Sequence, residues 1–199
     1  MPRFTEAEKE HIRHLLLTKG RELFSRYGLA KTSIDDIVQV CGIGKGTFYK
    51  FFSSKEELFY VILHQEEAGR EQLLSQLLRD EKLSPKERIA AFFRKAFQLA
   101  DENPFLRFLF EDGEYERLIR KLPRHLVESA SRDNLDKGKE VIAALMDRGI
   151  LRKNDPEIVA GVMQAVLMLR MHKEKLGEER FPLIMERMID CVAEGLTRR

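Results

Sequence analysis

The chain has 199 residues, of which 43% are hydrophobic and 34% charged, a composition typical of a globular protein rather than a disordered one. No apolar run reaches membrane-spanning length, and the opening stretch MPRFTEAEKE lacks the apolar segment of a signal peptide. The two cysteines, Cys41 and Cys191, are too far apart in sequence for a Cys-x-x-Cys metal site and too few for a disulfide framework. We therefore expect a cytoplasmic protein with no membrane contact.

The net charge of +2 conceals an uneven distribution along the chain. Residues 1–55 carry ten Lys and Arg against six Asp and Glu, whereas residues 56–199 carry 25 against 27. The basic excess therefore lies in the first quarter of the chain. An excess of this size favours nucleic acid only weakly when taken alone.

Helix starts and stops follow one another along the chain, and no strand pattern interrupts them. Ser84-Pro85, Asn103-Pro104 and Asp155-Pro156 each combine a capping residue with a first-turn proline. Candidate left-handed caps end the periodic segments at Gly28, Gly113, Gly149, Gly177 and Gly195. We predict an all-α fold of about nine helices. They span about residues 5–27, 33–41, 45–52, 54–80, 85–102, 104–112, 115–148 with Pro123 as a candidate break, 156–176 and 181–195.

The first two helices have amphipathic patterns. Ile34, Ile37, Val38 and Cys41 follow helical spacing in the second, which Thr32 or Ser33 would cap together with Asp35 or Asp36. Gly20 would let a neighbouring element approach the first helix closely. The apolar stripe of the first helix comprises Ile12, Leu16, Leu23, Phe24 and Tyr27.

The stretch CGIGKGTF, which follows the second helix, has the glycine content of a phosphate-binding loop but the wrong spacing. A Walker loop needs Gly-Lys-Ser/Thr, and a dinucleotide loop needs Gly-x-Gly-x-x-Gly after a strand. Residues 42–44 instead form a tight turn into a third short helix. In that helix Phe48 and either Phe51 or Phe52 would face inward, with Lys45, Thr47, Tyr49 and Lys50 outside.

Two short helices joined by a glycine turn and supported by a longer helix make a helix-turn-helix. The segment from Arg21 to Phe59, about a fifth of the chain, strongly resembles the DNA-binding domain of the TetR/AcrR family of bacterial transcriptional regulators. The sequence departs from the family at Gly44, where a serine commonly caps the recognition helix, and at Gly20, where alanine is frequent. The resemblance rests on Phe24, Gly28, Thr32-Ser33, Asp36-Ile37, Gly42, Gly46-Thr47-Phe48-Tyr49 and Phe52-x-x-Lys55-Glu56-x-Leu58.

The resemblance implies a helix-turn-helix domain over residues 1–54 that binds a double-stranded DNA operator. Small residues at Gly44 and Gly46 would let the recognition helix enter the major groove, although they could also serve only to shape the turn. Thr32, Ser33 and Lys55 are expected to contact phosphates at helix N-termini. For the two hydroxyls ordinary capping is the competing explanation, and it is compatible with a phosphate contact; for Lys55 the alternative is capping or surface charge. The expected DNA-binding residues are Thr32, Ser33, Lys45, Gly46, Thr47, Tyr49, Lys50 and Lys55.

The resemblance further implies that residues 55–199 form a helical domain for effector binding and dimerisation. Residues 92–110 hold six of the 13 phenylalanines, which is ordinary core density or, if a pocket exists, the wall of a site for a small apolar or aromatic effector. Its expected lining is Phe93, Phe97, Phe105, Phe108, Tyr115 and His125. In the family the last two helices build a four-helix bundle between two subunits, so we expect a homodimer. The expected interface residues are Val159, Val162, Met163, Val166, Ile184, Met188 and Val192.

The leading hypothesis is a ligand-responsive regulator, most often a repressor in this family, with no cofactor and no metal. An all-α enzyme that uses His64, Glu66 and Glu67 is the alternative from another class, and it lacks a nucleophile, base and orienting group. A helical interaction protein is the third reading. Both cysteines fall on apolar stripes, so packing is their expected role.

Overall fold

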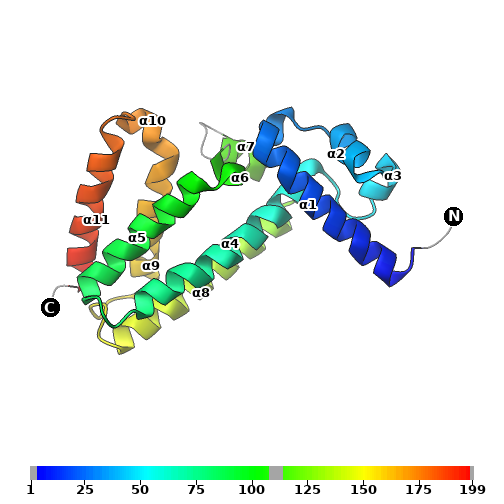
Figure 1. Cartoon of the computed structure of the whole chain (residues 1–199). Coiled ribbons are helices and arrows are strands. Elements are labelled where there is room, and N and C mark those ends of the chain that lie inside the picture. Colours follow the sequence, from blue (N-terminus) through cyan, green and yellow to red (C-terminus); the bar gives the residue numbers. More distant parts are fainter. Residues whose placement is uncertain (1–3, 108–113, 198–199) are drawn as a thin grey trace. The chain divides into compact units, whose positions relative to one another are not determined.

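The computed structural model describes residues 4–107 and 114–197, in which every regular element is a helix (Figure 1). The all-α prediction is therefore confirmed. The chain divides into two compact units, one of residues 1–69 with 101–122 and the other of residues 70–100 with 123–199. This division cuts the fourth helix, whereas the predicted functional boundary lies at its start. That boundary stays a prediction.

The first unit packs its helices around a set of phenylalanines. The ring of Phe59 stacks on Phe105 at 4.5 Å between centroids and meets Phe24 edge-on at 5.2 Å, and all three side chains are fully buried. Aromatic burial of this kind contributes much of the stability of a small core. The unit contains α1 (Glu6–Lys31), α2 (Ile34–Cys41), α3 (Lys45–Phe48), the first part of α4 (Lys55–Arg79), α6 (Pro104–Arg107) and α7 (Glu114–Lys121).

Helix α1 differs from its prediction near the C-terminal end. Gly28 takes the expected left-handed conformation (φ 77°), but one more helical turn follows it, so Gly28 marks a kink. Tyr27, predicted on the apolar stripe, is 44% exposed because it lies just before this kink. Gly20 is confirmed as a point of close packing, since a Cβ there would lie 2.9 Å from Cδ2 of Leu58.

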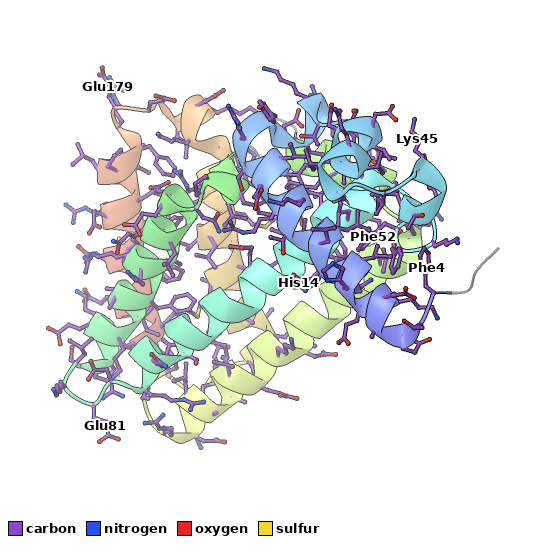
Figure 2. All side chains as sticks on the ribbon, turned by 45° about the vertical axis from the view of Figure 1, so that its right-hand side comes forward. Phe4, His14, Lys45, Phe52, Glu81 and Glu179 are labelled. Atoms are coloured by element: carbon purple, nitrogen blue, oxygen red, sulfur yellow. The ribbon has the colours of Figure 1, made fainter. Side chains whose placement is uncertain are left out.

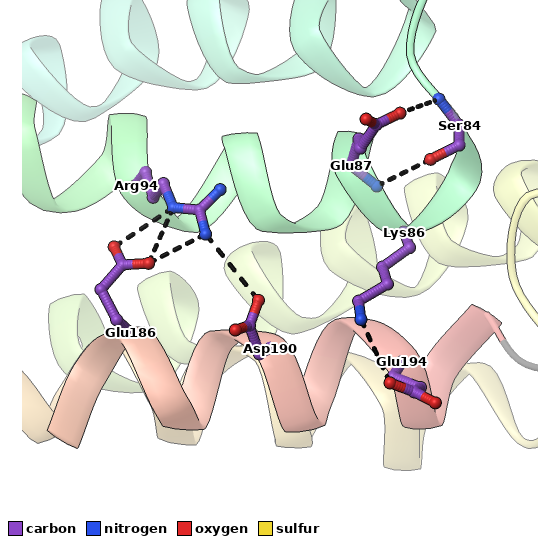
Figure 3. A network of polar contacts seen from close by, with 7 residues as sticks. All are labelled: Ser84, Lys86, Glu87, Arg94, Glu186, Asp190 and Glu194. Atoms are coloured by element: carbon purple, nitrogen blue, oxygen red, sulfur yellow. Dashed lines mark hydrogen bonds and ion pairs between the residues drawn. The ribbon is translucent and has the colours of Figure 1, made fainter. Parts of the chain in front are cut away.

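The second unit has its own aliphatic and aromatic core, which includes the fully buried Ile89, Phe93 and Ile189. Ion pairs join α5 to α11: Arg94 lies 2.8 Å from Glu186, and Lys86 lies 3.1 Å from Glu194 (Figure 3). Exposed pairs of this kind add little stability each but fix which faces meet. The unit contains the rest of α4, α5 (Pro85–Glu102) except its last two residues, α8 (Arg124–Asp147), α9 (Pro156–Met168), the 3-10 helix η2 (Leu169–His172), α10 (Lys173–Leu176) and α11 (Phe181–Thr197).

The predicted helix boundaries hold where local capping sets them. Ser84 and Glu87 form the expected capping box at the start of α5 (Figure 3), and Pro123 separates α7 from α8. The prediction for Gly195 is wrong, because α11 continues through it to Thr197. Gly149 and Gly177 have the expected positive φ angles, whereas Gly113 lies outside the described residues. The single helix expected over residues 156–176 is divided into α9, η2 and α10.

Candidate nucleic-acid interface

Helix α2 begins at a capping box that fixes its first turn. The backbone N–H of Asp36 donates to Oγ of Ser33 at 3.1 Å, and the N–H of Ser33 donates to Oδ2 of Asp36 at 2.8 Å. Hydrogen bonds from the Ser33 hydroxyl and backbone hold the pKa of Asp36 below its usual value. Of the two predicted caps, Ser33 is therefore the correct one. Thr32 is buried instead, and its hydroxyl donates to the carbonyl of Gly28 at 2.7 Å.

The turn between α2 and α3 depends on a left-handed glycine. Gly42 has φ 64°, and the N–H of Ile43 donates to the carbonyl of Val38 at 3.1 Å, the closing bond of a Schellman cap. An L-residue with a side chain is strained in this conformation. Gly44 is the N-cap of α3 and provides no side-chain cap. The turn thus sets the direction in which α3 leaves α2.

The recognition segment, residues 44–52, has one buried face and one exposed face. Helix α3 ends at Phe48 rather than near residue 52. Beyond it the N–H of Lys50 donates to the carbonyl of Thr47 at 3.1 Å, three residues back instead of the four of an α-helix. Phe48 and Phe52 are 0% and 2% exposed, so they anchor the segment in the core. The prediction that Phe48 and either Phe51 or Phe52 face inward is confirmed, with Phe52 as the second.

The outer face of the recognition segment carries the predicted polar and basic groups. Tyr49 is 53% exposed, Lys45, Gly46 and Lys50 are exposed, and Thr47 is half-buried. The ammonium of Lys45 lies 2.9 Å from a carboxylate oxygen of Asp35, which raises the pKa of Lys45. Both side chains are solvent-exposed, so the pair is easily exchanged for another anion. The exposed face of the recognition segment is therefore basic, through Lys45 and Lys50, and aromatic, through Tyr49; Figure 2 labels Lys45 on it.

Gly44 and Gly46 are not required by packing within the chain. A Cβ built on either glycine meets no atom within 4 Å, and neither has a positive φ angle. This is the opposite of Gly42, whose backbone demands glycine. Packing within the described part of the subunit therefore leaves room for a larger residue at positions 44 and 46.

Lys55 binds within its own unit. Its ammonium donates to the carbonyls of Thr32 at 2.6 Å, Leu29 at 2.7 Å and Ala30 at 3.4 Å, which belong to the C-terminal end of α1. An ammonium has three protons, and these carbonyls accept all three. Burial lowers the pKa of Lys55. The contacts match the capping alternative of the sequence analysis.

The residues of the enzyme alternative are engaged in structural contacts. Nε2 of His64 lies 2.8 Å from the Tyr60 hydroxyl, and Glu66 accepts hydrogen bonds from Arg21 at 2.6 Å and from Asn103 at 2.7 Å. The side chain of Glu67 lies outside the described residues. Among the side chains that the structure describes, no three of His, Cys, Asp or Glu gather as metal ligands. No helix of the described residues is long and apolar enough to cross a bilayer.

The cysteines differ from each other in their surroundings. Cys41 is buried as predicted, and burial raises the pKa of its thiol. The prediction that Cys191 is packed is wrong, because its side of α11 faces away from the core and the thiol is exposed.

The predicted effector residues are distributed over both units. Phe93 and Phe97 belong to the core of the second unit, whereas Phe105 lies in the aromatic stack of the first. Tyr115 is half-buried on α7. Phe108 and the side chain of His125 lie outside the described residues.

The predicted dimer residues fall on two different sides of α9 and α11. Val159, Met163 and Val166 are buried in the core of their own subunit. Val162 and Met188 are 38% and 37% exposed, and Ile184 and Val192 are half-buried. Two strongly exposed apolar residues of these helices, Ile158 at 59% and Leu183 at 74%, are not among the predicted interface residues. A shallow surface hollow on α11 is lined by Arg180, Leu183, Ile184, Arg187, Met188 and Cys191.

Comparison with known proteins bears on the first unit most directly. Residues 16–61 match the model of the bacterial regulatory proteins, tetR family. The chain is 28% identical over 161 residues to an uncharacterized HTH-type transcriptional regulator, YhgD of Bacillus subtilis, covering 75% of this chain and 76% of that protein. It is 26% identical over 145 residues to the HTH-type transcriptional repressor NemR of Escherichia coli, covering 72% and 68%.

The fold as a whole also has solved counterparts. The crystal structure of a TetR-family transcriptional regulator from Pectobacterium atrosepticum superimposes with a TM-score of 0.75 at 20% identity and covers 98% of this chain and 99% of that one. At this identity the likeness concerns the fold. It extends to the helices that follow the helix-turn-helix.

Proposed function

Because the chain is a TetR-family DNA-binding transcriptional regulator, we propose that it binds a near-palindromic operator as a homodimer, represses transcription there, and is released by a small apolar or aromatic effector. This family consists of regulators rather than enzymes. Action on operator DNA places the protein in the cytoplasm. The repressor role is supported by the similarity to NemR, which is described as a repressor.

The observation that carries the proposal is that the recognition segment has one buried face and one exposed face. Phe48 and Phe52 fix it to the core, which leaves Tyr49 and Lys50 exposed beside Lys45. A short helical segment fits the major groove, where lysine can bind phosphates or guanine and a tyrosine can contact bases or sugar. Lys45 can release Asp35 for a DNA phosphate, because an exposed pair contributes little.

The open space around Gly46 supports a close approach of DNA to this surface. Glycine lowers helix stability by about 1 kcal/mol relative to alanine, and nothing within the subunit requires it at this position. A backbone that comes close to a sugar or a phosphate would require it. This reading favours the groove-entry role for Gly46 over the turn-shaping role.

Thr32, Ser33 and Lys55 serve the shape of the domain in this proposal. The Thr32 hydroxyl and the Lys55 ammonium both bind carbonyls at the end of α1, and the Ser33 hydroxyl completes the capping box of α2. These contacts hold α1, α2 and α4 in the arrangement that presents the recognition segment. Base and phosphate contacts then come mainly from Lys45, Gly46, Thr47, Tyr49 and Lys50.

Dimerisation uses the exposed sides of α9 and α11. Ile158 and Val162 are one turn apart on α9, and Leu183 and Met188 are exposed on α11. Burying such side chains against a second copy gains about 1.5–3 kcal/mol for each one that becomes fully buried. A two-fold dimer would place two recognition segments about 34–36 Å apart, or somewhat more, to match successive major grooves.

The effector class rests on the six phenylalanines of residues 92–110, of which Phe92, Phe93 and Phe97 belong to the second unit. A ligand releases DNA only if it prefers the conformation that binds DNA poorly, and a preference of about 3 kcal/mol changes operator affinity by roughly a hundredfold. A matching compound should raise the melting temperature and weaken operator binding together. Thermal shift with fatty acids, acyl thioesters and planar aromatics identifies such a compound.

Selection of bound sequences from a random double-stranded DNA library tests the proposed function. The expected result is enrichment of a near-palindrome whose half-sites are centred about one helical turn apart, or somewhat more. Retention of DNA without sequence enrichment would contradict operator recognition. Enrichment of a single half-site would contradict the dimer.

A further inference from the structure

Phe4, just before α1, contacts the recognition segment across 46 positions of sequence. The ammonium of Lys50 lies 4.9 Å from the centroid of the Phe4 ring, within the range of a cation–π contact. Phe4 is half-buried, and Lys50 is exposed. Figure 2 labels Phe4 at the start of α1, on the side of the molecule that also carries Phe52. An aromatic ring therefore lies beside a lysine of the proposed DNA-binding surface.

The backbone next to Phe4 is fixed by the first turn of α1. Thr5 caps the helix: the N–H of Glu8 donates to Oγ1 of Thr5 at 3.2 Å, and the N–H of Thr5 donates to Oε2 of Glu8 at 2.7 Å. A second cation–π contact joins the same elements, because the guanidinium of Arg13 lies 5.2 Å from the ring of Phe52. Two independent contacts thus hold the first half of α1 against the recognition segment.

From this geometry we propose that Phe4 is a positioning residue for DNA binding: its ring holds the Lys50 side chain in the orientation from which the ammonium contacts DNA. Phe4, just before α1, is therefore part of the proposed DNA-binding surface. This inference rests on the proposed function, in which Lys50 contacts DNA.

The contact with the Phe4 ring leaves the ammonium of Lys50 able to bind DNA. A carboxylate partner, as Asp35 is for Lys45, neutralises the lysine and occupies its protons, and DNA must displace it. The face of a phenyl ring attracts the ammonium through its quadrupole and leaves the positive charge and most of the N–H donors available. A free lysine loses up to about 2 kcal/mol of rotamer entropy when it is fixed, and a restrained one loses less on binding.

A double-mutant cycle of Phe4→Leu and Lys50→Met, measured by fluorescence anisotropy with the selected operator, tests this role. Leucine keeps apolar volume and removes the ring, so Phe4→Leu should weaken operator binding about two- to fivefold. In the Lys50→Met background the same substitution should have no effect. Phe4→Tyr, which keeps the ring, should bind within about twofold of the wild type.

The salt dependence of operator binding distinguishes a residue that positions Lys50 from a residue that contacts a phosphate itself. Lys50→Met should reduce the slope of log affinity against log salt by about 0.9, the value for one phosphate contact, whereas Phe4→Leu should leave the slope unchanged. Equal loss from Phe4→Leu in both backgrounds would overturn the inference, as would no loss in the wild-type background. If Lys50→Met alone binds normally, the inference fails, while the sequence selection reports separately on operator recognition.

Discussion

The recognition segment of the first unit and the exposed sides of α9 and α11 in the second both leave large apolar side chains in water. Tyr49 is 53% exposed, and Leu183 is 74% exposed. Tyr49 is a single exposed aromatic between the lysines at 45 and 50, whereas Leu183 shares its hollow with Ile184 and Met188 as well as with Arg180 and Arg187. Exposure of a large apolar residue points to a partner, and the number of apolar neighbours around it points to the kind of partner. The first surface suits a polyanion and the second suits another copy of the chain.

The largest expected effect is at the α11 surface. Leu183→Asp should raise the dimer dissociation constant at least about a hundredfold, because dimerisation would bury an unpaired carboxylate. The subunit should remain folded, since this side chain is exposed in the free chain. Analytical ultracentrifugation measures the dimer, and circular dichroism measures the fold.

Val166→Asp is the matched control for the α11 variant, because Val166 is 3% exposed and belongs to the subunit core. It should unfold the subunit rather than only separate the dimer. A Leu183→Asp protein that sediments as an unchanged dimer would remove this surface from the interface.

The next largest effect is expected for Lys55. Its substitution distinguishes a structural role of this lysine from a DNA-binding role. Lys55→Met should lower the free energy of unfolding by about 1–3 kcal/mol, since the carbonyls of Leu29 and Thr32 lose their charged donor. The salt slope of DNA binding should stay at its wild-type value. Chemical denaturation and anisotropy at several salt concentrations check the two parts. A reduction of the slope by about one unit would make Lys55 a phosphate ligand instead.

Two glycines of the turn should respond in opposite directions. Gly42→Ala should destabilise the protein by about 1–2 kcal/mol, because φ 64° is strained for alanine. Gly46→Ala should stabilise it by up to about 1 kcal/mol, because the added methyl has open space and favours the helix. The same Gly46→Ala variant should bind the operator more weakly. If it binds with wild-type affinity, DNA does not approach this backbone closely.

The smallest effect is at Asp35, whose carboxylate pairs with Lys45. Asp35→Asn should strengthen DNA binding by a few-fold, because Lys45 no longer has to be released and a negative charge near the phosphates is removed. Asp36→Asn, at the neighbouring position, should instead lower the melting temperature, because Asp36 completes the capping box with Ser33. Equal behaviour of the two variants in the DNA assay would assign the effect to general charge rather than to Lys45.

Local chemistry explains what the sequence predicted well. The capping box of α2, the Gly42 turn and the inward face of Phe48 depend on residues a few positions apart, so spacing indicates them, although it left Thr32 and Ser33 as alternative caps. Lys55 was ambiguous because its partners lie 23 to 26 positions earlier, and only the kink at Gly28 brings those carbonyls to it.

The exposed side of α9 could not be separated from its buried side by periodicity. Val159 and Met163 form one stripe of helical spacing, and Ile158 and Val162 form another directly beside it. Both stripes are apolar, so the hydrophobic pattern is wide and gives no sign of which half faces the subunit core. Packing against the rest of the second unit decides it.

Operator binding by the variant Tyr49→Ala, Lys50→Ala tests most directly the claim that the outer face of the recognition segment binds DNA. Anisotropy at fixed salt compares it with the wild type and with Lys153→Ala, which removes an exposed lysine of the second unit. The account predicts an unchanged melting temperature and a loss of operator affinity of about a hundredfold or more, with near-normal binding by the control. Wild-type affinity in the double variant would contradict it.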